Sequence, residues 1–246
     1  MRHYAREFCS VEVDSTFYGA PAPALLTRWK QAVPAQFTFA LKLAREITHE
    51  RRLVGCANAV AAFFAAAQAL GPQLEAVLVQ LPPDFSPDEW DALAAFVPLL
   101  PAGARIALEV RDPRWFAAAW QAELFALLRE YGLALAVSDG PFVELNLMLA
   151  AFAQPTASFA YVRWLGRRDS VLKFDRATID RGPQLERWSA ALRSAATRIE
   201  RVCGYANNHS MGHGPATIRA MNRALGIENI APPRFVQTEL FPTGLS

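Results

Sequence analysis

The 246-residue chain lacks the patterns that mark several common protein classes. No apolar run reaches the roughly 18–20 residues that span a bilayer, and residues 1–4 do not resemble the start of a signal peptide. The chain has three cysteines, and Cys9, Cys56 and Cys203 match neither a zinc-ligand spacing nor a disulfide framework. We therefore expect a soluble cytoplasmic protein whose cysteines are small buried hydrophobic residues.

Charge and catalytic motifs are equally sparse. The net charge is +2, which gives no strong nucleic-acid signal. No Gly-x-Gly-x-x-Gly, Gly-x-Ser-x-Gly or His-Glu-x-x-His motif is present, which disfavours a dinucleotide-binding domain, a serine nucleophile of the hydrolase type and a zinc protease. With 52% hydrophobic and 20% charged residues, the chain is too apolar to be disordered. The sequence assigns no cofactor and no oligomeric state.

What the sequence does show is an alternation of short β-type runs with longer Ala- and Leu-rich runs of helical period. Such alternation favours a parallel sheet, because parallel neighbours need a crossover connection. The length, with no linker, predicts one α/β domain over 1–246, a TIM-type (β/α) barrel. The predicted strands are 10–18, 37–42, 76–81, 106–111, 133–138, 158–164 and 202–206. The predicted helices are 23–32, 56–70, 87–97, 115–131, 142–153, 185–198 and 215–225, and 231–246 is expected to wrap the surface.

Seven strands are recognisable, whereas a closed (β/α)₈ barrel needs eight, so the first strand of the barrel is predicted to be missing from this chain. Residues 2–8 resemble the end of a helix whose strand would lie upstream. Two explanations stay open. Either the start site is placed too far downstream, or the barrel has an open seam whose unpaired edges would be exposed to aggregation. We favour the first.

Polar side chains gather at the C-terminal ends of the predicted strands. Strands of a parallel barrel are buried on both faces, so a charge within one needs a partner or a function. The C-terminal rim carries the active site in such barrels, because the βα loops meet there. The residues concerned are Glu12, Asp14 and Thr16 on one face of the first strand, then Lys42, Gln80, Glu109, Arg111, Asp139, Arg163, Asn207 and Asn208. An ion-pair network that merely plugs the barrel would give the same pattern, since buried charges need partners whatever their function.

Histidines near this rim offer further possibilities. His209 and His213 are four residues apart, which on a helix would place both on one face as metal ligands, but the glycines around them indicate a loop. That loop and the start of helix 215–225 would instead offer free backbone N–H groups to an anion. His49 follows the second strand, where it would serve as a general acid or base.

At these segments the sequence resembles the YecE-like family (domain of unknown function seventy-two). The matching runs are YAREFCSVEVDSTFY at 4–18, FTFALKLAREITH at 37–49, QLPP at 80–83, EVRDPRW at 109–115, YVRWLG at 161–166 and NNHSMGHGP at 207–215. The resemblance implies a TIM-type barrel but no reaction, because the family has no settled activity. Two family features are absent: a Gly-Thr-Ser-Gly-Trp-like turn after an N-terminal strand, and a His at the position of Leu165.

Three functions fit these residues. The first, which we favour, is a hydrolase or lyase that acts on a small phosphorylated or carboxylated substrate by general acid–base catalysis. Its catalytic residues would be Glu109, Glu12, His49 and Asp139, and its substrate-binding residues Lys42, Arg111, Arg163, Gln80, Asp14, Asn207 and Asn208, with no metal assigned. The second is a metal-dependent nuclease or phosphoesterase that uses the acidic residues and the histidines. The third is a non-catalytic module that binds a ligand or a protein partner.

Overall fold

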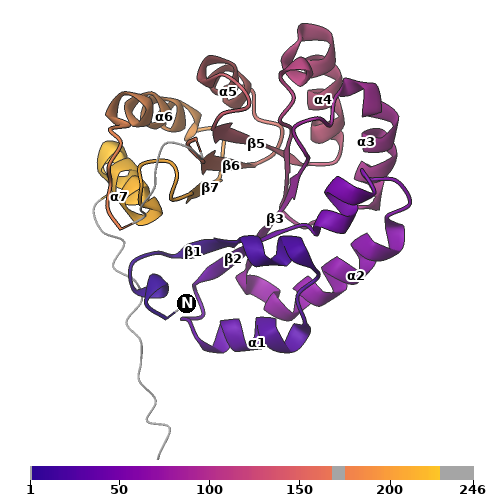
Figure 1. Cartoon of the computed structure of the whole chain (residues 1–246), viewed down its shortest axis with the longest axis horizontal. Helices are drawn as coiled ribbons and strands as arrows, with labels where there is room; N and C mark the ends of the chain where they lie inside the picture. The colour runs from indigo at the N-terminus through magenta and orange to yellow at the C-terminus, as the bar shows by residue number, and fades with distance from the viewer. Residues whose placement is uncertain (1, 168–174, 228–246) are drawn as a thin grey trace, which may run out of the picture.

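The computed structural model describes residues 2–167 and 175–227. These residues contain seven parallel strands, each paired with the next along the chain, in a nearly closed barrel with helices around it (Figure 1). The predicted α/β barrel is thereby confirmed. The strands are β1 (Ser10–Val13), β2 (Thr38–Lys42), β3 (Leu74–Gln80), β4 (Ile106–Glu109), β5 (Ala134–Asp139), β6 (Phe159–Trp164) and β7 (Arg201–Ala206). The helices are α1 (Pro23–Gln31), α2 (Ala57–Ala67), α3 (Trp90–Phe96), α4 (Ala118–Glu130), α5 (Leu145–Phe152), α6 (Gly182–Ala195) and α7 (Gly214–Leu225). The predicted surface segment 231–246 lies outside the described residues.

The first strand is shorter than predicted. β1 ends at Val13, and Asp14–Tyr18 form a 3-10 turn. The Thr16 hydroxyl holds this turn, because it lies 3.0 Å from the Val13 carbonyl oxygen and 2.8 Å from that of Lys42, and it accepts from the Lys42 amide at 3.0 Å. The expected alternation of Glu12, Asp14 and Thr16 along one face is therefore wrong beyond Val13. Thr16 is buried, whereas the Asp14 side chain is 62% exposed.

The other elements lie close to their predicted positions, and the differences are local. The predicted strand 106–111 ends at Glu109, so that Arg111 is in the following loop. A π-helical turn at Glu46–Glu50, which carries His49, was not predicted. Cys56 and Cys203 are buried as expected, but Cys9 is exposed, because it precedes β1 at the edge of the sheet.

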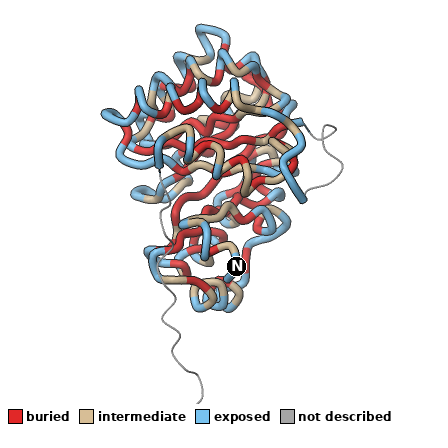
Figure 2. The backbone as a smooth tube through the Cα atoms, turned by 90° about the vertical axis from the view of Figure 1, so that its left-hand side faces the viewer, coloured by how far each residue is buried: buried red, intermediate tan, exposed pale blue. Residues whose placement is uncertain are grey.

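Two apolar cores lie on the two sides of the sheet. Large side chains such as Phe39, Phe63 and Leu108 pack between the sheet and the helices. Inside the barrel the side chains are mostly small: Ala40, Ala76, Leu78, Ala107, Ala134, Ala136, Phe159, Tyr161, Cys203 and Tyr205. In Figure 2 the buried stretches run through the middle of the molecule, and the exposed ones follow the outer sides of the helices.

The alanine-rich interior positions the polar residues above it. Side chains alternate along a strand, so the residue two positions further on points into the barrel as well. Lys42 follows Ala40 in this way, and Glu109 follows Ala107. Small interior side chains therefore leave the C-terminal end of the barrel to long, charged ones.

β1 and β7 are the two ends of the sheet, and no ladder joins them within the described ranges. The Ser10 and Tyr205 hydroxyls, 2.9 Å apart, bridge this seam. A cavity of about 770 Å³ opens beside it, between these strands and α7. A further strand upstream stays a prediction. Within the same described ranges, no helix has both the length and the apolar character needed to cross a bilayer.

Candidate functional site at the C-terminal rim

Arg163, near the end of β6, is the centre of a buried ionic cluster. Its Nη2 and Nε donate to the two carboxylate oxygens of Glu12, on β1, at 2.6 and 3.0 Å. Its Nη1 donates to Glu109 Oε2, at the end of β4, at 2.6 Å. The Tyr161 hydroxyl also donates to Glu12 Oε2, at 2.7 Å. One guanidinium therefore connects β1, β4 and β6, and the side chains of Arg163, Glu12 and Glu109 are 5%, 9% and 0% exposed.

Arg111 extends the cluster toward solvent. Its Nε donates to Glu109 Oε1 at 2.6 Å and its Nη2 to Gln80 Oε1 at 2.9 Å. Gln80 is the register partner of Glu109 in the β3–β4 ladder, which explains why the two lie side by side. Gln80 Nε2 is 3.5 Å from His49 Nε2, and the Thr48 hydroxyl is 2.8 Å from His49 Nδ1. We call Glu12, Lys42, His49, Gln80, Glu109, Arg111 and Arg163 the rim cluster.

Lys42 is the last residue of β2 and is 8% exposed. Its Nζ lies 3.9 Å from the centre of the Phe17 ring. His49 meets the same ring edge to face, with 4.9 Å between the ring centres. Burial and the Arg163 guanidinium lower the pKa of Lys42 to about 8, although Asp14 acts in the opposite direction. A fraction of this amine is therefore neutral close to neutral pH.

The charge states of Glu109 and His49 are set by the same cations. Burial raises the pKa of Glu109, but Arg163 and Arg111 outweigh burial and hold this pKa at about 2. Glu109 is thus ionised, with both oxygens accepting from guanidinium groups, which suits it to holding two arginines in place. Burial lowers the pKa of His49 to about 4, and Lys42 and Arg111 act in the same direction. Its imidazole is therefore neutral near neutral pH.

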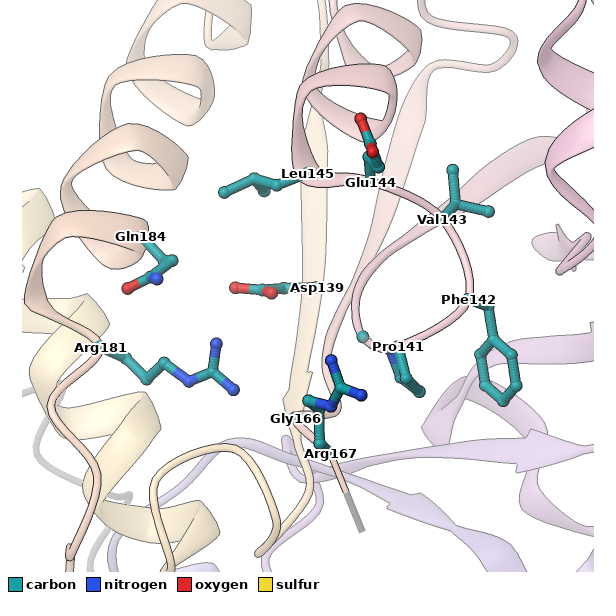
Figure 3. A pocket seen from close by; sticks show the side chains of 11 residues that line it. Asp139, Pro141, Phe142, Val143, Glu144, Leu145, Gly166, Arg167, Arg181 and Gln184 are labelled. Carbon is teal, nitrogen blue, oxygen red and sulfur yellow. The ribbon is translucent and has the colours of Figure 1, made fainter. Parts of the chain in front are cut away.

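Asp139 lies on the same rim but outside the rim cluster. It ends β5 and lines a separate cavity of about 350 Å³ (Figure 3). The side chains of Arg181 and Gln184 extend toward it from the start of α6. Burial raises the pKa of Asp139, and Arg181 opposes this shift. Phe142 lines this cavity and packs its ring against the Arg111 guanidinium, 4.4 Å away, so one aromatic side chain lies between the cavity and the rim cluster.

Three of the predicted substrate-binding residues are not brought into the cluster. Asp14 is exposed, 4.0 Å from Arg163. Asn207 and Asn208 are exposed as well, and their Oδ1 atoms accept from backbone amides, of His209 at 3.0 Å and of the first residue of α7 at 2.8 Å. Both asparagines shape the loop that leads into α7, and a role in substrate binding stays a prediction for them.

The histidines of that loop do not form part of a recognisable metal centre. α7 begins at Gly214, so His209 and His213 lie before the helix and not on one face of it, as the glycines indicated. Among residues 2–167 and 175–227, no three His, Cys, Asp or Glu side chains are grouped to hold a metal ion.

Sequence reasoning missed a second buried ionic cluster, at the opposite end of the barrel. The Glu75 carboxylate, 2% exposed, accepts from Thr38 Oγ1 at 2.6 Å and from Arg201 Nη2 at 2.7 Å, and Arg105 Nε lies 3.5 Å away. The β2–β3 register shifts beside Glu75, between Phe39 and Ala40, and such an irregularity re-aims a side chain. We call Glu75, Arg105 and Arg201 the basal cluster.

Two aromatic residues of the rim were also missed. Tyr161 is two positions before Arg163, so the alternation of β6 already placed both on one face. Phe17 had no such signal, because it belongs to the 3-10 turn that replaces the predicted end of the first strand.

Comparisons with known proteins show the family to which the chain belongs. The profile described as "Protein of unknown function DUF72" matches residues 1–239. The UPF0759 protein YecE of Escherichia coli K12 is 34% identical over 117 residues, which are 48% of this chain and 43% of that protein, and the same values hold for strain O157:H7.

Solved structures share the fold. A DUF72 family protein from Enterococcus faecalis V583 has a TM-score of 0.77 at 19% identity and covers 95% of this chain and 90% of its own. Another from Thermotoga maritima MSB8 has a TM-score of 0.67 at 20% identity, with 87% and 83% covered. The family profile covers nearly the whole chain, which therefore belongs to the DUF72 family.

Proposed function

We propose that this chain is a hydrolase or lyase that acts, by general acid–base catalysis, on a small phosphorylated or carboxylated substrate at the C-terminal rim of the barrel. The observation that carries the proposal is an imbalance of charge. Three cations, Arg163, Arg111 and Lys42, meet two buried carboxylates, Glu12 and Glu109. The third carboxylate nearby, Asp14, is 62% exposed and 4.0 Å from Arg163, so solvent screens its charge. An anionic ligand would neutralise the remaining positive charge, and arginine binds carboxylate and phosphate oxygens through paired donors.

The rim residues divide into three roles under this proposal. Glu12 and Glu109 hold Arg163 and Arg111 in fixed orientations, since their oxygens already accept from guanidinium groups. Arg111, with 14% of its side chain exposed, would contact the substrate anion. His49 is better placed than Glu12 or Glu109 to act as general base, because its imidazole is neutral and is oriented by Thr48 through Nδ1.

The direct test is a thermal-shift screen of the whole chain against inorganic phosphate, phosphorylated sugars and short carboxylates. A ligand at about a hundred times its dissociation constant should raise the melting temperature by roughly 5–10 °C. Arg111→Gln should abolish this rise. The matched control is Arg114→Gln, because Arg114 lies three positions further on, is 58% exposed and pairs with Asp112 and Asp88, which do not belong to the rim cluster.

The outcomes separate the candidate functions. Equal effects of the two substitutions, or no stabilisation by any anion, would contradict an anion site at the rim. Stabilisation without turnover would favour the non-catalytic binding module. Stabilisation and phosphoester cleavage that both require an added divalent metal would favour the metal-dependent phosphoesterase.

A further inference from the structure

Lys42 stands apart from the other charged residues of the rim. Arg163 and Arg111 each donate to carboxylate oxygens within 3.0 Å, whereas the Lys42 Nζ makes no hydrogen bond and no ion pair with any residue that the structure describes. Its contact is the face of the Phe17 ring. A buried ammonium without a carboxylate partner is unfavourable, so this environment favours the neutral amine of Lys42 over the charged ammonium.

The neighbouring charges also favour the neutral form of Lys42. Glu12 and Glu109 are the buried carboxylates of the rim cluster, and both are bound to Arg163. Lys42 therefore faces two guanidinium groups whose counterions are already engaged. Burial, Arg163 and Arg111 favour loss of its proton, and Asp14 and Glu12 oppose them less strongly. A desolvated lysine beside other cations is the arrangement that makes an amine nucleophilic.

The composition of the chain gives an independent reason to single out this lysine. The sequence has 22 arginines but three lysines, Lys30, Lys42 and Lys173. Where this chain needs a cation to hold a buried carboxylate, at both ends of the barrel, it uses arginine. Arginine stays protonated in proteins and cannot act as an amine nucleophile. A lysine at the rim supplies chemistry that an arginine would not.

We propose that Lys42 is the nucleophile of this site and forms an imine with the carbonyl carbon of an anionic aldehyde or ketone, such as an oxo acid or a ketose phosphate. This inference rests on the proposed function and narrows it to a lyase. The Lys42 Nζ lone pair attacks the carbonyl carbon, and the carbonyl π electrons and a proton from nitrogen pass to oxygen, giving a carbinolamine. Its hydroxyl takes up a proton from solvent and leaves as water, while the nitrogen lone pair forms the carbon–nitrogen double bond, which gives a protonated imine.

The protonated imine then acts as an electron sink. A proton or a carbon substituent on the adjacent carbon leaves without its bonding electrons, which move into the imine and give an enamine. Protonation of the enamine carbon and attack by water on the resulting imine release the carbonyl product and restore the amine. Arg111 would hold the substrate anion, and His49, whose imidazole is neutral and contacts the same Phe17 ring as Lys42, would take up the proton.

Trapping by borohydride tests the assignment on the full chain. The folded protein is incubated with pyruvate, glyoxylate or dihydroxyacetone phosphate, reduced, and digested for peptide mass spectrometry. The expected result is a reduced adduct on the Lys42 peptide, at least tenfold above that on Lys30. Lys30, on α1, is the internal control, because it lies outside the rim cluster. Its Nζ donates to the Ala69 carbonyl oxygen at 3.1 Å. Lys42→Arg should lose the adduct while keeping the charge, and Lys30→Arg should not.

A pair of probes separates the failure of this inference from the failure of the proposed function. Dihydroxyacetone and its phosphate differ by the anion alone. No adduct on Lys42, although the same phosphate stabilises the folded protein, would overturn the imine and leave the anion site standing. Equal labelling by both probes would overturn the preference for an anionic carbonyl compound. Labelling of Lys30 and Lys42 to the same extent would show ordinary surface reactivity and overturn the assignment of Lys42.

Discussion

The two ends of this barrel are closed by buried ionic clusters of similar composition but different balance. In the basal cluster the Glu75 carboxylate accepts from Arg201, while Arg105 Nε donates to the Glu75 backbone carbonyl and lies 3.5 Å from the carboxylate. Both arginines are half-exposed, 42% for Arg105 and 53% for Arg201. In the rim cluster the arginines are themselves buried, 5% exposed for Arg163 and 14% for Arg111. The basal arginines stay partly exposed to water, whereas the rim arginines depend on protein oxygens.

A buried charge alone is therefore a weak sign of function in this fold. Both clusters contain a carboxylate with a lowered pKa, Glu75 and Glu109, and both connect distant strands. The rim differs because it also contains Lys42, a buried cation that has no carboxylate partner among the described residues. A buried charged group without an ion-pair partner is therefore a better candidate for contact with a ligand than a paired one.

Glu109→Gln is expected to have the largest effect on stability. The substitution leaves Arg163 and Arg111 buried beside a neutral amide, and removal of one partner of a buried pair typically costs about 3–5 kcal/mol. Urea unfolding at neutral pH measures the loss. A loss below about 1 kcal/mol would mean that solvent reaches the rim arginines, and the contrast between the two ends of the barrel would disappear.

The pH dependence of that loss follows from the lowered pKa of Glu109. The folded-state pKa is about 2, below its ordinary 4.5. Its contribution to stability is therefore complete above 4.5 and is lost as the pH falls toward 2, because the unfolded chain takes up the proton first. The difference between wild type and Glu109→Gln should shrink across this range, measured by unfolding curves at several pH values. A constant difference would show that Glu109 is not ionised in the folded protein.

Glu75→Gln is the matched substitution at the other end, and a smaller loss of about 1–2 kcal/mol is expected. Arg105 and Arg201 can turn into water when their carboxylate is removed, because both are already half-exposed. The same urea experiment checks the order of the two losses. If Glu75→Gln is the more damaging, the basal cluster is the more tightly coupled of the two.

The sequence predicted the rim cluster better than the basal cluster, and the reason is local geometry. Gln80, Glu109 and Arg163 lie at or next to the ends of regular strands, so period-2 alternation alone placed them on the inner face. Glu75 lies at a register shift, which no periodicity reveals. Asp14 was misplaced for a related reason, since the hydroxyl of Thr16 ends the strand early. Side-chain hydrogen bonds with distant backbone decide such points, and they are invisible in a single sequence.

The separation of Asp139 from the rim cluster was equally beyond sequence reasoning. Its place at the end of β5 was predicted, but a seven-stranded barrel has a rim wide enough for more than one group of side chains. Phe142 divides the two, and its contact with Arg111 joins residues from two loops. Predicting that a residue belongs to the rim is therefore easier than predicting which neighbours it has there.

Lys42→Met should stabilise the protein by about 1–2 kcal/mol at neutral pH, in contrast to both glutamate substitutions. The variant removes a buried ammonium that has no partner. The folded-state pKa of Lys42 is about 8, below its ordinary 10.5, so wild-type stability rises with pH between these values relative to the variant. Unfolding curves from neutral to alkaline pH should show the gain vanish. A destabilised variant would mean that the ammonium is held by favourable contacts, which would remove the distinction between Lys42 and the arginines.

The smallest effect is expected at Cys203, whose thiol lies 3.5 Å from Glu75 Oε1 in the basal cluster. Cys203→Ala should cost less than about 1 kcal/mol, because a thiol is a weak donor. Burial and Glu75 raise the pKa of Cys203 to about 12, so a disulfide reagent should modify exposed Cys9 in the folded protein and Cys203 only after unfolding. Comparable rates of modification at both thiols would show that the basal end of the barrel is open to solvent.

Burial disfavours the charged form of a titratable group at both ends of the barrel. For a thiol the charged form is the nucleophile, so burial lowers the reactivity of Cys203. For an amine the neutral form is the nucleophile, so burial raises the reactivity of Lys42.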